Sequence, residues 1–187
     1  MPKTQYYTAT TIDGFIADPD NSLAWLFEVE DDISRSPFPT FFADVGAFAM
    51  GATTYEWVLD HDSMLTQPAK WHDYYGSVPC WVFTHRELSP IPGVDLRFVS
   101  GDVRPVHAEM ASAAGDKNLW VVGGGELAGR FADAGLLDEL ILGVTPATLG
   151  AGAPLLPRRL TAARLSLTDV ERRGQFAYLT YALAAPR

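Results

Sequence analysis

Short apolar runs that end at glycine or hydroxyl residues recur along this chain, and they constrain its fold more than any other feature. Residues 47–50 and 119–122 are entirely apolar and stop at Gly51 and Gly123, and residues 80–83 form a third such run. Runs of this length without polar alternation are typical of parallel strands that are buried on both faces. The sequence therefore predicts an α/β fold with a mainly parallel sheet and helices on both of its faces.

The remaining segments continue this alternation along the chain. Helical patterns separate the strands up to residue 144, and a turn at 173–175 then divides the two strands of an antiparallel hairpin. Residues 59–77, rich in histidine, aspartate and aromatic residues, form the least regular stretch, and residues 146–157 are predicted to be a loop rich in glycine and proline. We expect a single domain over residues 1–187. The expected strands are 6–11, 15–17, 47–50, 80–83, 96–99, 119–122, 139–144, 165–171 and 176–183, and the expected helices are 39–45, 53–58, 104–114 and 127–134.

Composition excludes several classes of partner. The formal net charge is −9, and a surface this acidic repels nucleic-acid backbones and anionic lipid, so neither is an expected partner. No apolar run is long enough to span a bilayer. The lone cysteine, Cys80, lies in an apolar run, which predicts a buried and reduced thiol. Together with an N-terminus that lacks an apolar leader segment, this favours a cytoplasmic protein.

Gly51 and the threonines that follow it form the first candidate ligand site. A glycine at the carboxyl end of a parallel strand lets a ligand approach the backbone, and the next helix presents free N–H groups and a positive dipole end. Thr53 or Thr54 can donate a hydrogen bond to a phosphate. The alternative is an ordinary turn in which a threonine caps the helix.

Three consecutive glycines form the second candidate site, where Gly123, Gly124 and Gly125 end a strand and lead at once into a helix. Three glycines cost conformational entropy, and the cost is explained if a pyrophosphate must lie against bare backbone. The spacing is not that of the common dinucleotide fingerprint, whose glycines stand at positions one, three and six. A tight turn between strand and helix is the alternative.

A hydroxyl, an imidazole and a guanidinium form the third candidate site, as Thr84, His85 and Arg86 follow a buried strand. This set suits the 2′-phosphate of NADPH, because arginine can hold a phosphate through two N–H donors. The alternative is an exposed loop in which Arg86 pairs with Glu87 or Asp95.

Five motifs follow one another along the chain. They are TIDGFIA at residues 11–17, MGATTYE at 50–56, VFTHR at 82–86, VGGGEL at 122–127 and TLGAGAPL at 148–155. In this order they resemble the dihydrofolate reductase-like superfamily, and most closely the reductase domain of bacterial riboflavin biosynthesis (the RibD C-terminal domain) and its stand-alone relatives. The resemblance extends over nearly the whole chain. It implies a three-layer fold with a mostly parallel mixed sheet of about eight strands, and NADPH bound in an extended form across the strand ends.

The resemblance also implies which residues bind the cofactor. Residues 13–25 resemble a mobile loop over the nicotinamide, with Trp25 near the ring. The implied cofactor-binding residues are Ala9 beside the nicotinamide, Gly51, Thr53 and Thr54 at the phosphates, Thr84, His85 and Arg86 around the 2′-phosphate, and Gly123, Gly124, Gly125, Glu126 and Leu127 at the pyrophosphate and ribose.

The implied reaction is transfer of a hydride from reduced nicotinamide to a C=N or hemiaminal carbon of a small heterocycle, as in 5-amino-6-(5-phosphoribosylamino)uracil reductase. The protein would orient the cofactor and exclude water. One alternative is a non-enzymatic NADP-binding or sensor protein that kept the fold, and a second is a true dihydrofolate reductase. The family also implies a bacterial homodimer.

Catalytic and substrate residues depart from the family pattern. Dihydrofolate reductases bind the pterin ring with a carboxylate, and counting on from Trp25 favours Glu30 for that role. Glu30 and Trp25 are also the two candidates for a catalytic residue. Ala52 replaces a basic residue that often holds the cofactor phosphate, which leaves NADH possible. The other carboxylate candidates are Glu28, Asp31 and Asp32, and the candidates for a basic clamp on a phosphorylated substrate are Arg35, Lys70, Arg158 and Arg159.

No metal is predicted. The chain has four histidines, and their spacing matches no standard metal site. They are His61, His72, His85 and His107.

Overall fold

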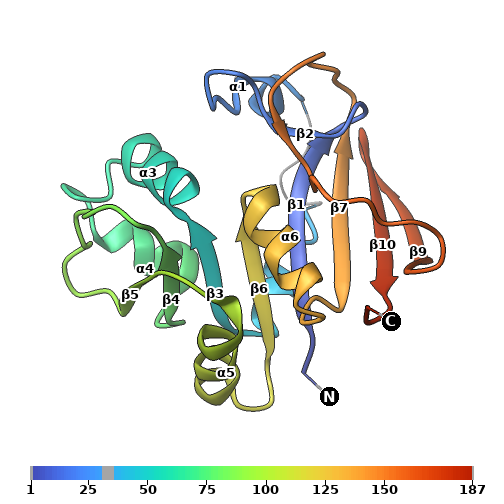
Figure 1. The fold of residues 1–187 in the computed structure, drawn as a ribbon. Helices are drawn as coiled ribbons and strands as arrows, with labels where there is room; N and C mark the ends of the chain where they lie inside the picture. The colour runs from blue at the N-terminus through green and yellow to red at the C-terminus, as the bar shows by residue number, and fades with distance from the viewer. Residues whose placement is uncertain (1, 31–35, 187) are drawn as a thin grey trace.

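The computed structural model describes residues 2–30 and 36–186 (Figure 1). Its strands are β1 (Thr4–Thr11), β2 (Phe15–Ala17), β3 (Val45–Gly51), β4 (Cys80–Phe83), β5 (Leu96–Val99), β6 (Asn118–Gly123), β7 (Glu139–Thr145), β8 (Ala153–Pro154), β9 (Leu165–Arg173) and β10 (Phe176–Leu183). Its helices are α1 (Ala24–Phe27), α2 (Phe38–Ala43), α3 (Ala52–His61), α4 (Ala69–Tyr75), α5 (Val103–Ala114) and α6 (Gly125–Asp133).

Eight strands form one sheet in the order β5-β4-β3-β6-β1-β7-β10-β9. Neighbouring strands are parallel from β5 to β7, whereas β10 runs antiparallel to both β7 and β9. The sheet therefore ends in the hairpin of β9 and β10, which lies beside β7 in Figure 1. These features confirm the predicted mostly parallel mixed sheet with a C-terminal antiparallel hairpin.

The central strands supply side chains to two separate cores. Along β3, Ala47 and Ala49 belong to one buried cluster, whereas Phe48 and Met50 belong to the other. Successive side chains of a strand point to opposite faces, so a strand covered on both faces needs an apolar residue at every position. Helices α5 and α6 cover the first cluster, and α2, α3 and α4 cover the second. This is why the apolar runs show no polar alternation.

The strand register brings three carboxyl ends to one edge of the sheet. Tyr6 of β1 pairs with Val121 of β6, and Ala49 of β3 pairs with the same residue from the other side. Because these three strands are parallel neighbours, their last residues open onto a common edge. Ala9, Gly51 and Gly123 lie at or near those strand ends.

Residues 59–77, the least regular stretch of the sequence, contain a helix, α4, that the sequence pattern did not reveal. Its Trp71 is fully buried, and the indole ring stacks on Phe48 at 5.8 Å between ring centroids. The ring of Tyr75, one turn later, lies 4.7 Å from that of Trp71. Two aromatic side chains on one face hold this helix against the core, although its short sequence carries no extended apolar period.

Residues 146–157 were expected to be a loop, and this is wrong for β8. Its two residues pair with β2, with Phe15 opposite Pro154 and Ala17 opposite Ala153. Gly152 precedes β8 at φ +148°, and a Cβ at this position would overlap the carbonyl oxygen of Ala17. This small sheet holds the late loop against the turn that follows β1.

Cys80 is fully buried in the second core, which confirms the predicted buried thiol. Within residues 2–30 and 36–186, none of the helices combines the length and the apolar character needed to cross a membrane.

Candidate functional site

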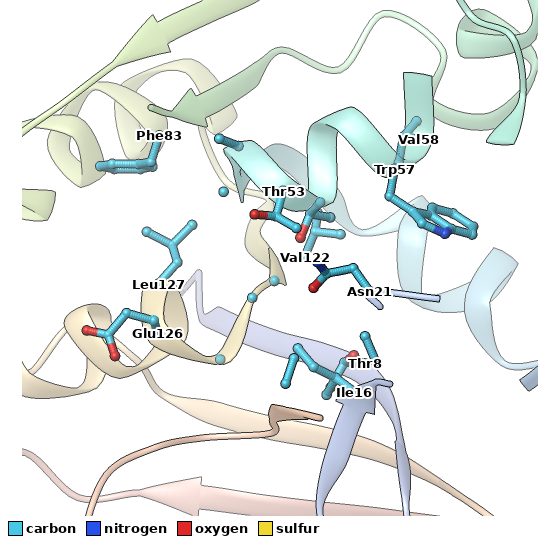
Figure 2. Close-up of a pocket in the computed structure, with 18 of the residues that line it drawn as sticks. Thr8, Ile16, Asn21, Thr53, Trp57, Val58, Phe83, Val122, Glu126 and Leu127 are labelled. Carbon is cyan, nitrogen blue, oxygen red and sulfur yellow. The ribbon is translucent and has the colours of Figure 1, made fainter. Parts of the chain in front are cut away.

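A cavity of about 820 Å³ opens at the common edge of β1, β3 and β6 (Figure 2). A volume of this size is typical of sites that take a whole cofactor or a drug-sized ligand. Its walls come from β1, β2, α3, the β6–α6 junction and β8. The lining residues are Tyr7, Thr8, Ala9, Ile16, Ala17, Asn21, Leu23, Gly51, Ala52, Thr53, Thr54, Trp57, Val58, Tyr75, Phe83, Trp120, Val122, Gly123, Gly124, Gly125, Glu126, Leu127, Arg130, Ala153, Pro154 and Pro157.

Helix α3 begins at this cavity without a side-chain cap. Its N-cap is Gly51, and no side chain accepts a hydrogen bond there. Thr53 and Thr54 lie inside the first turn and line the cavity, so the alternative in which a threonine caps the helix is wrong. The first N–H groups of a helix have no partner within it, and they favour an anion.

Helix α6 begins at the same cavity in the same way. Gly124 is its N-cap, again without a side-chain hydrogen bond, and the peptide bond between Gly123 and Gly124 is cis. Helix α5, which starts away from the cavity, differs: its N-cap Asp102 accepts a hydrogen bond from the Arg104 N–H at 3.0 Å. Helices α1, α2 and α4 also begin without a side-chain cap, so α3 and α6 are distinguished by N-caps that are glycines lining the cavity.

The glycines at these junctions differ in whether packing requires the absence of a side chain. A Cβ on Gly125 would overlap the carbonyl oxygens of Pro154 and Leu155, so packing against the β8 segment requires glycine there. Gly51 and Gly124 have extended backbones at φ −80° and −76°, which any residue can adopt. Their added Cβ atoms would come no closer than 3.7 Å and 3.9 Å to other atoms.

Neither conformation nor packing therefore accounts for Gly51 and Gly124. Both line the cavity, and a side chain at either position would occupy part of it. The bare backbone in front of two helix N-termini forms a cradle of N–H groups at the positive ends of two helix dipoles, an arrangement that favours an anion.

Thr84, His85 and Arg86 lie outside the lining of this cavity. Arg86 donates from Nη1 and Nη2 to the two carboxylate oxygens of Glu56, at 2.9 and 2.8 Å. The alternative in which Arg86 pairs with Glu87 or Asp95 therefore names the wrong partner, because α3 packs beside β4 and places Glu56 within reach. The ion pair is exposed, and such pairs contribute little to stability. The role of these three residues at the 2′-phosphate stays a prediction.

Arg130 is a lining residue that the sequence motifs missed. It lies on α6, its guanidinium carbon is 5.3 Å from the centre of the Phe83 ring, and it donates to the carbonyl of Gly101. Among the lining residues it is the one arginine or lysine that the described part of the chain contributes. Helical spacing could have found it, because Arg130 follows the predicted Leu127 by three residues on one face of the helix.

Glu126, predicted to be near the pyrophosphate or ribose, lines the cavity in an ion pair. Arg158 donates to both of its carboxylate oxygens, at 2.9 and 2.7 Å, and these bonds lower the pKa of Glu126. The same arginine donates to Asp133 at 2.7 Å. Arg158 is thus engaged by two carboxylates and does not line the cavity.

The other candidates for a basic clamp lie elsewhere. Lys70 donates to the backbone carbonyl of Asp62 at 3.1 Å, and neither Lys70 nor Arg159 lines the cavity. Arg35 lies outside the described residues.

The candidates for catalysis and for the pterin carboxylate also fall outside the lining. Trp25 is buried, and its Nε1 has no hydrogen-bond partner in the described part of the chain. Asn21 and Leu23 of the same loop line the cavity in its place. Glu28 and Glu30 are exposed and do not line it, and Asp31 and Asp32 lie outside the described residues.

Aromatic and aliphatic side chains line the cavity on both sides of the glycine turn. In Figure 2, Trp57, Val58 and Asn21 lie on one side of the glycine turn, and Phe83 and Leu127 lie on the other. Ala9, predicted to lie beside the nicotinamide, lines the cavity. The aromatic residues Tyr7, Tyr75 and Trp120 line it as well.

No cluster of three or more histidine, cysteine, aspartate or glutamate side chains that could hold a metal ion occurs within residues 2–30 and 36–186.

Comparison with known proteins identifies relatives over almost the full length. The sequence profile of the RibD C-terminal domain matches residues 2–178. The uncharacterized protein YwjB of Bacillus subtilis (strain 168) is 32% identical over 184 residues, which cover 97% of this chain and 98% of that protein.

Solved structures share the fold. A Shewanella sp. PV-4 protein, whose name links it provisionally to riboflavin biosynthesis, superposes with a TM-score of 0.78 at 25% identity, covering 97% of this chain and 99% of that one. Dihydrofolate reductase from Enterococcus faecalis, complexed with NADP(H) and RAB-propyl, gives a TM-score of 0.59 at 13% identity, with 97% and 96% covered. The predicted dihydrofolate reductase-like fold is thereby confirmed.

Proposed function

This chain belongs to the RibD C-terminal domain family, as its five motifs predicted, and from that premise we propose that it is an NADPH-dependent reductase of a small heterocyclic substrate. Its fold is that of the RibD-like reductases. The proposed reaction transfers a hydride to a C=N or hemiaminal carbon, in the manner of 5-amino-6-(5-phosphoribosylamino)uracil reductase.

The cradle of Gly51 and Gly124 is the observation that carries this proposal. Two helices, α3 and α6, begin there without side-chain caps and line the same cavity. Two neighbouring helix N-termini suit two linked phosphates, because each offers unpaired N–H groups and the positive end of a dipole. A pyrophosphate held there would direct the rest of a dinucleotide along the strand ends in both directions.

Other lining residues would have different roles in cofactor binding and hydride transfer. The hydroxyls of Thr53 and Thr54 would donate to the phosphates, and Ala9 would leave room for the nicotinamide beside β1. When bound in its reduced form, the cofactor would supply the hydride and leave as NADP⁺. The apolar walls would keep bulk water away and orient the acceptor carbon, and a single water molecule admitted with the substrate would supply the proton that balances the reduction.

A paired titration of NADPH and NADH, followed by tryptophan fluorescence, tests the cofactor site. We expect NADPH to bind at least about tenfold more tightly, which corresponds to about 1.4 kcal/mol, and we expect Arg86→Ala to remove that preference. If neither dinucleotide bound, the proposal would be wrong. If NADPH bound but oxidised heterocycles caused no NADPH consumption, the non-enzymatic NADP-binding alternative would be favoured.

A further inference from the structure

Gly143 lies in the interior of β7, where a glycine weakens the strand and often marks the close approach of another group. Its φ is not positive, so backbone conformation does not require glycine at this position. A Cβ on Gly143 would lie 3.1 Å from Cε1 and 3.5 Å from Cζ of Tyr178. The absence of a side chain at Gly143 therefore makes room for the Tyr178 ring to lie over β7.

The Tyr178 side chain lies on the same face of the sheet as that of Tyr7. Strands β1, β7 and β10 are neighbours in the sheet (Figure 1). Ala9 of β1 pairs with Gly143, and Gly143 pairs in turn with Tyr178. Paired residues point to one face, and Tyr7, two positions before Ala9, points to that face as well. Tyr7 and Ala9 line the cavity, whereas Tyr178 does not.

The Tyr7 hydroxyl connects β1 with β10. It hydrogen-bonds with the side chain of Tyr178 and with that of Ser36. The ring of Tyr7 stacks on Phe41 at 4.5 Å between ring centroids. Aromatic packing thus fixes the ring, and a second hydroxyl that lies behind the cavity wall fixes the direction of the Tyr7 O–H bond.

The surroundings of Tyr7 act on its two protonation states in opposite directions. Burial raises its pKa most, and Tyr178 raises it further, so the phenol stays protonated at neutral pH. The positive charge of Arg173 and the hydrogen bond with Ser36 lower the pKa of Tyr7 and so favour the phenolate. The Arg173 Nε also lies 2.9 Å from a carboxylate oxygen of Glu171. Tyr7 therefore holds its proton at rest, while groups that stabilise its charged form lie next to it.

We infer that Tyr7 donates a proton to the nitrogen of the C=N bond that the proposed reductase reduces, and that Tyr178 positions the Tyr7 hydroxyl for this transfer. The inference rests on the proposed function, in which the nicotinamide lies beside Ala9 on the same strand. The acceptor carbon gains the hydride, and the π-electron pair of the C=N bond moves to nitrogen. An N–H bond forms there as the O–H bond of Tyr7 breaks. The water molecule admitted with the substrate then returns a proton to Tyr7 and leaves as hydroxide.

Removal of the Tyr7 hydroxyl tests the inference, with 6-methyl-7,8-dihydropterin as the acceptor and NADPH consumption as the readout. Tyr7→Phe keeps the ring that stacks on Phe41, so KM for NADPH and the melting temperature should change little. We expect kcat to fall at least about 100-fold, because proton transfer by a positioned side chain contributes about 10²–10⁴-fold. The matched control Tyr74→Phe removes an exposed hydroxyl outside the cavity and should leave kcat unchanged. An unchanged kcat in Tyr7→Phe would overturn the inference, and so would absence of turnover in the unchanged protein.

Tyr178→Phe tests the positioning role separately, because it leaves the Tyr7 hydroxyl in place. We expect kcat to fall by about tenfold while KM stays the same, the pattern of an interaction made only in the transition state. The solvent deuterium isotope effect on kcat should rise, since proton transfer becomes the slow step, and a purely structural loss would not raise it. An isotope effect equal to that of the unchanged protein would refute the role of Tyr178.

A binding measurement provides a readout that needs no turnover. 6-Methylpterin and its 5-deaza analogue, in which a CH group replaces the ring nitrogen that would accept the proton, are titrated into the NADP⁺-saturated protein by quenching of tryptophan fluorescence. We expect 6-methylpterin to bind about tenfold more tightly, or about 1.4 kcal/mol, and Tyr7→Phe to remove this difference. Equal binding of the two probes would overturn the inference, and so would binding of neither.

A separate NADPH titration distinguishes the two proposals. Without NADPH binding the proposed function fails, and the inference fails with it. NADPH binding and turnover that Tyr7→Phe leaves unchanged would refute the proton donor alone.

Discussion

The Asp13 carboxylate accepts a hydrogen bond from the backbone N–H of Gly150 at 2.7 Å, and this bond joins positions that are 137 residues apart in the sequence. The same carboxylate accepts from the N–H of Leu149 at 3.1 Å and from the Thr11 hydroxyl at 2.5 Å. The first and the last of the five sequence motifs therefore meet in one hydrogen-bonded unit, which borders the cavity through β2 and β8.

This unit should loosen at low pH. The hydrogen bonds from Thr11 and Gly150 lower the pKa of Asp13. A depressed pKa stabilises the folded state above the unfolded value of about 3.9, and that contribution is lost as the pH falls through the folded value. We expect protection of the Leu149 and Gly150 amides from hydrogen exchange to be constant above pH about 5 and to fall below it.

Asp13→Asn should remove this pH dependence, and the exposed Asp20→Asn serves as a control for the loss of one negative charge. An unchanged pH profile in Asp13→Asn would show that another group controls the loop.

The adjacent glycines at the start of α6 should respond differently to alanine. Gly125→Ala forces a Cβ onto the Pro154 carbonyl oxygen, and overpacking of this kind costs about 1–3 kcal/mol of unfolding free energy. Gly124→Ala meets ordinary contacts, so its melting temperature should stay close to that of the unchanged protein while its affinity for NADPH falls. Thermal unfolding and fluorescence titration on both variants separate the two effects. Equal loss of stability in both would contradict the assignment of Gly124 to the cradle.

Arg130 should contribute to the binding of both dinucleotides. As the cation that lines the cavity at the α6 end, it would interact with phosphate groups that NADPH and NADH share. We expect Arg130→Met to weaken both by about tenfold or more, because a hydrogen bond to a charged group contributes about 1.5–3 kcal/mol. Arg104→Met, outside the cavity, is the matched control. A loss of affinity for NADPH alone would instead indicate that Arg130, and not Arg86, binds the 2′-phosphate.

The Cys80 thiol should be inert in the folded protein. It is fully buried, and burial raises its pKa well above the ordinary value. Because the thiolate is the reactive form, we expect labelling by a thiol reagent to be slow in buffer and rapid in denaturant. Fast stoichiometric labelling without unfolding would mean that β4 opens locally.

The outer strand of the hairpin provides a test of the proposed homodimer. Leu167 and Val170 on β9 are 53% and 61% exposed, and β9 is the last strand of the sheet. Exposed strand edges with apolar side chains favour pairing with another chain. We expect a dimeric mass by light scattering at micromolar concentration, reduced to a monomer by Val170→Glu but not by Phe27→Glu. A monomeric mass for the unchanged protein would exclude this arrangement.

The sequence predicted the sheet because its signals are local. In a run such as residues 47–50, every residue is apolar, and this alone indicates a strand buried on both faces. The glycine that follows the run marks the strand end. Helix α4 was missed because its stability comes from Trp71 packing on Phe48, a contact between segments that no local period reveals.

Part of the cavity lining was predictable for the same reason. The backbone cradle was found from Gly51 and Gly124, which sit in short motifs and line the cavity. The pairing of Arg86 with Glu56 joins residues 30 positions apart, so it depends on how α3 packs beside β4. Tyr7, Tyr75 and Trp120 likewise reach the cavity from distant segments, and none of them belongs to one of the five motifs.

The two helices that form the cradle pack against different cores, on opposite faces of the sheet. Helix α6 is anchored in one core through Phe131, and helix α3 is anchored in the other through Tyr55. A ligand gripped by both helix ends would act as a crosslink across the sheet, since neither layer could melt without releasing it. Ligand binding would then raise the unfolding free energy of the whole chain by mass action, and hydrogen exchange in the two helices would slow in parallel even though their cores share no residue.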